Sequence, residues 1–149
     1  MTKGFLFYIN ILFVFCYCCT IKAQREEPVS NIGKSFTEMN TSVFPGMKFR
    51  RQINGETEYE WGDPNEGMIH IFTFRNNILV TECMLVESND GFATQFYNSL
   101  CDTFIGKYRW ALTSSSTGKQ HFVFTRYSLD IILNLHGNTE VLMFIYNKL

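Results

Sequence analysis

Short segments in which apolar and polar residues alternate recur along most of the chain, and each of them predicts a β-strand. They come in pairs joined by turn-forming residues such as Asn54-Gly55 and Gly137-Asn138, so each pair predicts an antiparallel hairpin. The predicted strands cover residues 47–53, 56–61, 68–75, 78–87, 107–113, 119–126, 129–135 and 139–147.

The first predicted hairpin is densely charged. Pairing across Asn54-Gly55 places Arg51 opposite Glu58, Arg50 opposite Tyr59 and Lys48 opposite Trp61. Such a charge load is typical of an outer strand that resists edge-to-edge aggregation. A charged docking surface is the alternative interpretation of the same pattern.

Two segments instead repeat their apolar residues at the helical spacing of three and four. The first predicts a helix that is capped by Ser30 or Asn31 and ended by Pro45-Gly46. Its apolar positions are Ile32, Phe36, Met39 and Val43. The second predicts a helix over 92–105, with Asp90 as its cap, Gly106 as its stop and a packed face made of Phe92, Phe96, Leu100 and Phe104.

The predicted order is a helix and four strands, followed by a helix and four strands again. We interpret residues 31–87 and 88–149 as two pseudo-repeats of one α+β domain. Such a domain has two layers, an antiparallel sheet of about eight strands and two helices packed on one face. This order resembles the tandem repeats of β-lactamase-inhibitor-protein-like domains and, more distantly, the TATA-box-binding-protein fold. The resemblance rests on element order and assigns no functional residue.

Both faces of the predicted sheet are largely apolar, although two helices can cover only one of them. In the second and fourth hairpins the face away from the helices carries Ile71, Val80, Ile132 and Met143, which we predict to be partner-contacting residues. A curled sheet that covers itself, or long loops or a second chain, would also explain the pattern. An exposed apolar surface would mark an interaction site.

Unbroken alternation through 78–87 assigns Cys83 and Leu85 to the core face and Met84 and Val86 to the opposite face. It also sets Cys83 opposite His70, so a Cys/His hydrolase is one possible function. A buried thiol beside a core histidine is the simpler explanation. Cys83 could alternatively form a disulfide with Cys101, a pairing that the sequence leaves open.

The N-terminus has the three parts of a secretory signal. Lys3 is followed by an apolar run of about 14 residues, and Ala23 precedes a polar stretch, which predicts cleavage after residue 23. An uncleaved anchor, or lipid attachment at Cys16, Cys18 or Cys19, is the alternative. Residues 24–30 predict a disordered lead-in. We therefore expect an exported protein, periplasmic or secreted, which meets a membrane through its N-terminus if at all.

Charge and motifs reduce the number of function classes that fit the chain. From Gln24 onward the chain has eleven basic and fourteen acidic residues, a net charge of −3, which argues against a nucleic-acid binder. No histidine or carboxylate group has metal-ligand spacing and no glycine-rich loop would hold phosphate, so no metal or cofactor is expected.

We therefore expect a non-catalytic protein that binds another protein, with an inhibitor or immunity-like role, or that self-associates. The alternative is a carrier or sensor that holds a small apolar ligand among Phe72, Phe96, Trp110 and Phe124.

Overall fold

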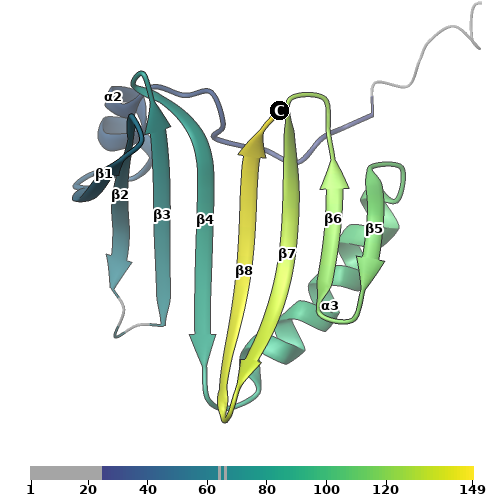
Figure 1. Cartoon of the computed structure of the whole chain (residues 1–149). Helices are drawn as coiled ribbons and strands as arrows, with labels where there is room; N and C mark the ends of the chain where they lie inside the picture. The colour runs from purple at the N-terminus through teal and green to yellow at the C-terminus, as the bar shows by residue number, and fades with distance from the viewer. Residues whose placement is uncertain (1–24, 64, 66) are drawn as a thin grey trace, which may run out of the picture.

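The predicted hairpins assemble into one antiparallel sheet of eight strands in a computed structural model that describes residues 25–63, 65 and 67–149 (Figure 1). The predicted α+β class and the eight-stranded antiparallel sheet are confirmed. The strands are β1 (Lys48–Ile53), β2 (Glu56–Asp63), β3 (Met68–Arg75), β4 (Ile78–Ser88), β5 (Leu112–Ser116), β6 (Lys119–Val123), β7 (Tyr127–His136) and β8 (Thr139–Lys148).

The order of the strands across the sheet is β1-β2-β3-β4-β8-β7-β6-β5. Each half of the chain therefore starts at one edge of the sheet and ends at its centre, where β4 pairs with β8. The central pairing runs from Thr81 opposite Asn147 to Ser88 opposite Glu140. It joins the halves through backbone hydrogen bonds between residues far apart in the sequence.

Helix α3 (Phe92–Tyr108) is longer than predicted, and its packed face is shifted: Leu100 and Phe104 of the predicted face pack against the core, but Phe92 and Phe96 do not. Its buried residues are Ala93, Tyr97, Cys101 and Tyr108, whereas Phe92 and Phe96 are 54% and 37% exposed. Gly106, the predicted stop, lies within the helix. The helix continues because Tyr108 adds another turn to its buried residues, with its ring centroid 4.5 Å from that of Phe104. The strand predicted over 107–113 therefore begins late, and β5 continues through Ser114–Ser116, which lie between two of the predicted strands.

The first helical segment begins later than predicted. Ser35, rather than Ser30 or Asn31, caps the short α2 (Phe36–Glu38) by accepting from the Glu38 amide at 3.2 Å. A π-helical turn, η1 (Met39–Val43), follows and is closed by the amide of Phe44, which donates to the Met39 carbonyl. Asn40 then accepts from the amides of Gly46 and Met47, which fixes the turn into β1.

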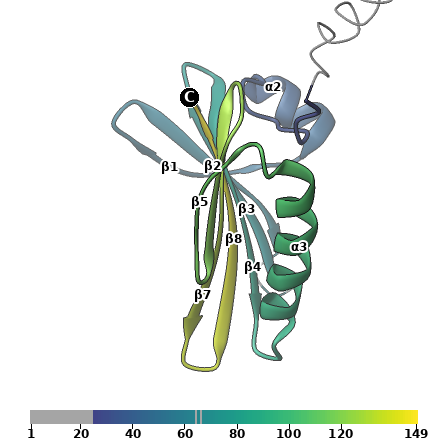
Figure 2. The same ribbon diagram turned by 90° about the vertical axis from the view of Figure 1, so that its right-hand side faces the viewer.

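The core lies on the side of the sheet that carries the helices, and Figure 2 shows α2 and α3 on that side. One apolar cluster joins η1 to β3 and β4, with Met39, Phe72 and Leu79 fully buried. The larger cluster joins α3 to β6, β7 and β8 around Phe122, Leu129 and Leu142. Burying this apolar area is the main source of stability for a domain of this kind.

Residues 25–34, here called the strap, cross the helix side of the sheet between the two clusters. Ile32 packs against both clusters, and the Gly33 amide donates to the Leu79 carbonyl. Nearer the N-terminus, Glu27 accepts from the Thr125 amide at 2.9 Å and the Tyr127 hydroxyl donates to the Pro28 carbonyl at 2.6 Å. The predicted disordered lead-in is therefore held by specific contacts across residues 25–30. The predicted signal, residues 1–23, lies outside the described residues.

Within the described part of the chain, no helix is long and apolar enough to span a membrane.

Candidate functional site

A β-bulge in β4 decides which side chains face away from the helices. Thr73 pairs with Thr81, but the next residue of β3, Phe74, pairs with Leu79, so Val80 is an extra residue in the ladder. The bulge reverses the alternation for the rest of β4 relative to the unbroken pattern. The predicted facing of residues 81–86 is therefore wrong: Met84 and Val86 pack into the core, while Cys83 and Leu85 face the opposite side.

The opposite side, here called the open face, has an apolar centre across four neighbouring strands. In one cross-strand row Ile69 pairs with Leu85, Leu85 with Met143, and Met143 with Ile132. In the next row Ile71 pairs with Cys83 and Cys83 with Ile145. We call the apolar patch Ile69, Ile71, Cys83, Leu85, Ile132, Val141, Met143 and Ile145, all of which are half-buried and outside both core clusters.

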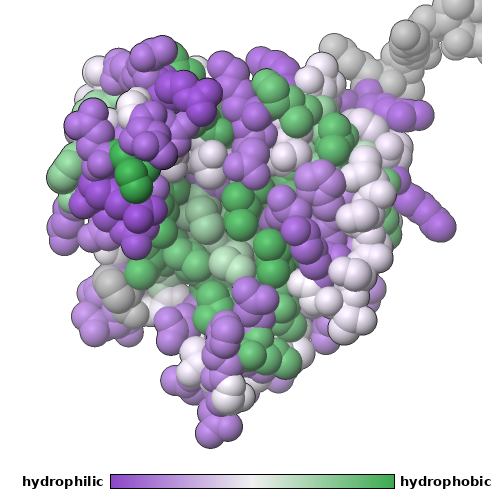
Figure 3. Space-filling model, viewed as in Figure 1, coloured by the Kyte–Doolittle hydropathy of each residue, from purple (hydrophilic) through white to green (hydrophobic). Residues whose placement is uncertain are grey.

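Figure 3 shows this patch as a continuous hydrophobic area over β3, β4 and β8, with hydrophilic residues on both flanks. The sequence analysis left open that the sheet curls over this face or that long loops cover it. Neither explanation applies, because no described element lies over the patch (Figure 2). A continuous exposed apolar surface is typical of an interaction site.

Three of the four predicted contact residues come together on this patch. Ile132 and Met143 are direct cross-strand neighbours, and Ile71 lies one row away, opposite Cys83. Val80, at the bulge, lies apart from them and lines a pocket at the end of the sheet with Thr81 and Leu149. The bulge thus removes one predicted residue from the site and brings in Leu85 and Cys83, which were assigned to the core.

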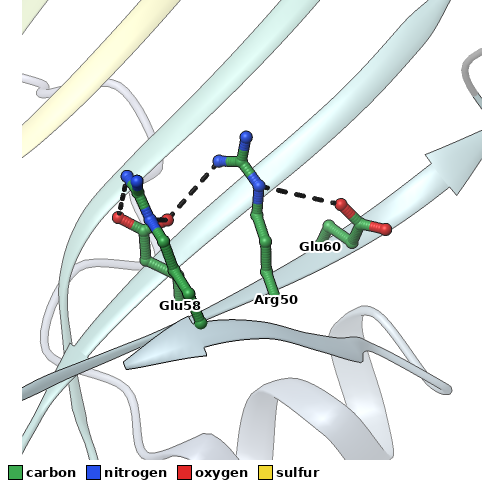
Figure 4. Close-up of polar contacts among 4 residues, drawn as sticks. Arg50, Glu58 and Glu60 are labelled. Carbon is green, nitrogen blue, oxygen red and sulfur yellow. Dashed lines mark hydrogen bonds and ion pairs between the residues drawn. The ribbon is translucent and has the colours of Figure 1, made fainter. Parts of the chain in front are cut away.

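The β1–β2 flank of the open face is an ion-pair network (Figure 4). Arg51 makes two hydrogen bonds to the Glu58 carboxylate at 2.6 and 2.9 Å, as the predicted pairing of these residues implies. These bonds lower the pKa of Glu58 and raise that of Arg51. Arg50 lies 3.4 Å from Glu58 and 3.9 Å from Glu60.

A second bulge lies in β1 at Arg50 and corrects the other two predicted pairs. Phe49, rather than Arg50, lies opposite Tyr59, and Lys48 lies opposite Glu60 rather than Trp61. The bulge therefore turns an additional guanidinium toward the open face, where it joins the Glu58 and Glu60 carboxylates.

The flank on β6 and β7 carries a smaller polar cluster that was not predicted from the sequence. The Asp130 carboxylate lies 2.9 Å from Nδ1 of His121 and 3.4 Å from Nζ of Lys119. Asp130 pairs with Ile145 and Lys119 pairs with Ile132, so this cluster borders the apolar patch directly. Following the alternation from β8 through β7 into β6 would have placed these residues on the open face.

The predicted Cys/His pair is not assembled. His70 lies opposite Met84, on the helix side, where it is buried against Phe44 and Phe72, while Cys83 lies on the open face. Burial raises the pKa of the Cys83 thiol, which disfavours the reactive thiolate. The bulge that separates the pair also brings Glu82 into the core, 3.7 Å from Nδ1 of His70.

Cys83 and Cys101 are both free thiols, so the disulfide that the sequence left open is not formed. The sheet separates them, because Cys101 is buried in the cluster beneath α3 and Cys83 faces the other way.

The aromatic residues expected to line a small-ligand cavity are also dispersed. Phe72 is buried in the cluster of η1, and Phe124 in the cluster of α3, where Trp110 packs against it edge to face. Phe96 is on the surface of α3. Among the described residues, no group of three or more histidine, cysteine or acidic side chains has a metal-binding arrangement.

No protein-family model, no curated protein and no solved structure matches the chain.

Proposed function

We propose that the chain is an exported, non-catalytic protein that binds another protein through the open face of its sheet. The observation that carries this proposal is the apolar patch at the centre of the sheet, which the fold leaves uncovered. Residues such as Ile71 and Met143 would lose their remaining contact with water on binding, which is the main favourable term in protein association. The flanking charged clusters would form the polar rim that surrounds the apolar centre of a typical interface.

The two halves support a tandem duplication as the origin of the fold. Each half begins with a helical segment, continues as two hairpins and ends at the sheet centre. A pseudo-twofold sheet of this kind, with both helices on one face, leaves its other face free for a partner. The element order that resembles β-lactamase-inhibitor-protein-like domains makes an inhibitor or immunity-like role the proposed use of that face.

The proposal is tested by affinity capture from an envelope extract of the source cell, followed by binding measurements with the purified captured protein. The variants Ile71→Glu and Met143→Glu should bind the captured protein at least about 30-fold more weakly, because each leaves an unpaired charge in an apolar interface, a penalty of about 2 kcal/mol or more. Circular dichroism must first show that both variants are folded.

Leu135→Glu provides the matched control, because Leu135 is 64% exposed in the same hairpin but on the helix-side face. This variant should bind as the wild-type protein does. Retained binding by both patch variants, with their fold intact, would contradict the proposed site.

A further inference from the structure

We propose that, beyond binding a different protein, the open face also pairs with the open face of a second copy of this chain. Two copies would bury their apolar patches against each other and form a homodimer. Three features of the described residues carry this inference: the location of the patch, the balance of charge on the face and the shape of the sheet.

The patch lies at the centre of the sheet. Its residues belong to β3, β4, β8 and β7, and β4 and β8 are the fourth and fifth of the eight strands. A twofold axis through this centre would place patch on patch, which makes the contact isologous, as in most homodimers. The charged clusters at both ends would then surround a continuous apolar contact.

The charges on the open face cancel. Among the described residues, the register places five basic and five acidic side chains there, so the face is neutral. They are Lys48, Arg50, Arg51, Arg75 and Lys119, with Glu56, Glu58, Glu60, Glu87 and Asp130.

Most of these charges are also paired within one copy. Glu58 binds Arg51, Glu56 binds Arg75, and Asp130 lies beside Lys119. The net charge of −3 from Gln24 onward therefore belongs to the rest of the chain. A face without net charge does not favour a strongly acidic or strongly basic partner. It also does not repel an identical copy, because most of its charged side chains are already neutralised by a partner in the same copy.

The shape of the sheet also suits a second copy. Figure 2 shows that the sheet is twisted and that the β1–β2 hairpin and the free end of the β7–β8 hairpin project on the open side. A twisted sheet is saddle-shaped, concave in one direction and convex in the other. Two sheets with the same twist pack face to face with their strand directions within about 30° of each other, which is the aligned geometry of sheet-on-sheet packing.

Sedimentation equilibrium and thiol labelling of the purified chain test the proposal together. The wild-type protein should show a monomer–dimer equilibrium that depends on protein concentration. Cys83 is a half-buried free thiol within the patch, so dimer formation should slow its alkylation by N-ethylmaleimide, measured by mass spectrometry, and dilution should restore the rate of the monomer. Met143→Glu should raise the dimer dissociation constant at least about tenfold, whereas Leu135→Glu should leave it unchanged.

A protein that remains monomeric at all concentrations would overturn this inference, as would a dimer that survives Met143→Glu in a folded variant. The labelling of the wild-type protein provides an answer even if a patch variant fails to fold, since a dimer whose Cys83 reacts as fast as that of the monomer uses another surface. A monomeric result would leave the proposed binding of another protein intact, because that binding is measured separately with the captured protein.

Discussion

Single polar side chains connect elements that lie far apart in the sequence. The Glu140 carboxylate, at the start of β8, accepts from the hydroxyl of Thr94 at 2.7 Å and from its amide at 3.1 Å, in the first turn of α3. It also accepts from Ser88 at the end of β4. Gly91 offers no capping side chain, so three other acceptors serve the first amides of α3. Asp90, the predicted cap, accepts from Phe92, Ser88 accepts from Ala93, and Glu140 accepts from Thr94, 46 positions away.

The Glu140 contacts predict a pH-dependent stability. The hydrogen bonds from Thr94, its side chain first and then its amide, lower the pKa of Glu140 below its usual value of 4.5. A group with a lowered pKa in the folded state stabilises the fold above its unfolded pKa and loses that effect as the pH falls through the folded pKa. The Glu140→Gln variant should therefore melt at a lower temperature than the wild type at pH 7.

The difference between the two melting temperatures should shrink as the pH falls below about 4.5, when the wild-type carboxyl becomes protonated. Thermal melts followed by circular dichroism over pH 3–7 would measure it. A difference that stays constant over this range would show that the carboxylate charge has no part in holding α3.

At the scale of the elements, the alternation of residues was sufficient to predict seven of the eight strands close to their observed positions, whereas the strand predicted over 107–113 overlaps β5 only at its end. The alternation also set the register of β7 and β8 correctly, because that hairpin has no bulge. It could not predict the bulges at Arg50 and Val80, since neither interrupts the pattern of residue types. One extra residue in β4 accounts for the misassignment of Cys83 and the absence of the Cys/His pair. The residues of the open face on β3, β7 and β8 were thus predictable from the sequence, whereas those on β4 were not.

The helices were predicted less well for a different reason. Helix α3 contains more apolar residues than it buries, and Ala93, Tyr97 and Cys101 lie beside the predicted stripe, so periodicity alone did not identify the buried residues. Packing selects the stripe with Ala93 and Cys101, whose small side chains let the helix approach the sheet closely, and it leaves Phe92 exposed.

Deleting Val80 tests the role of the bulge. Without the extra residue, either Leu79 leaves the core or every residue from Thr81 onward changes sides, which would bury Cys83 and expose Met84. We expect the free energy of unfolding, measured with urea, to fall by more than about 3 kcal/mol. Val80→Thr, which keeps the bulge, should change it by less than about 1 kcal/mol. Equal stability of the deletion variant and the wild type would show that the bulge does not set the facing of β4.

At the scale of the whole molecule, the strap explains how two helical segments cover one face of eight strands. It lies over the sheet where the two core clusters meet and reaches the far edge, where Arg25 stacks on Trp110 and Glu26 pairs with Lys107. The Asn31 amide donates to the buried Glu82 carboxylate at 3.2 Å. The strap therefore acts as a third covering element of the core, although it is neither helix nor strand.

Removing residues 25–29 should lower the free energy of unfolding by about 2 kcal/mol, because the hydrogen bonds of Glu27 and Pro28 are lost. Urea unfolding of the truncated chain, compared with the full chain, would measure this. The single variant Tyr127→Phe should cost about 1 kcal/mol or less, since it removes only the bond to the Pro28 carbonyl. An unchanged unfolding midpoint after truncation would mean that the strap merely rests on the surface.

The strap and the central strand pair also determine when the chain can fold. The bond from Thr125 to Glu27 spans 98 residues, and β4 has no central neighbour until β8, the last strand, has been made. Contacts between residues so far apart form late, because the intervening loop must close first. A chain proposed to cross a membrane N-terminus first would therefore be unable to complete its sheet during transit. Its first described residues would dock only after nearly all of the rest had emerged, so the topology itself would postpone completion of the fold until export is complete.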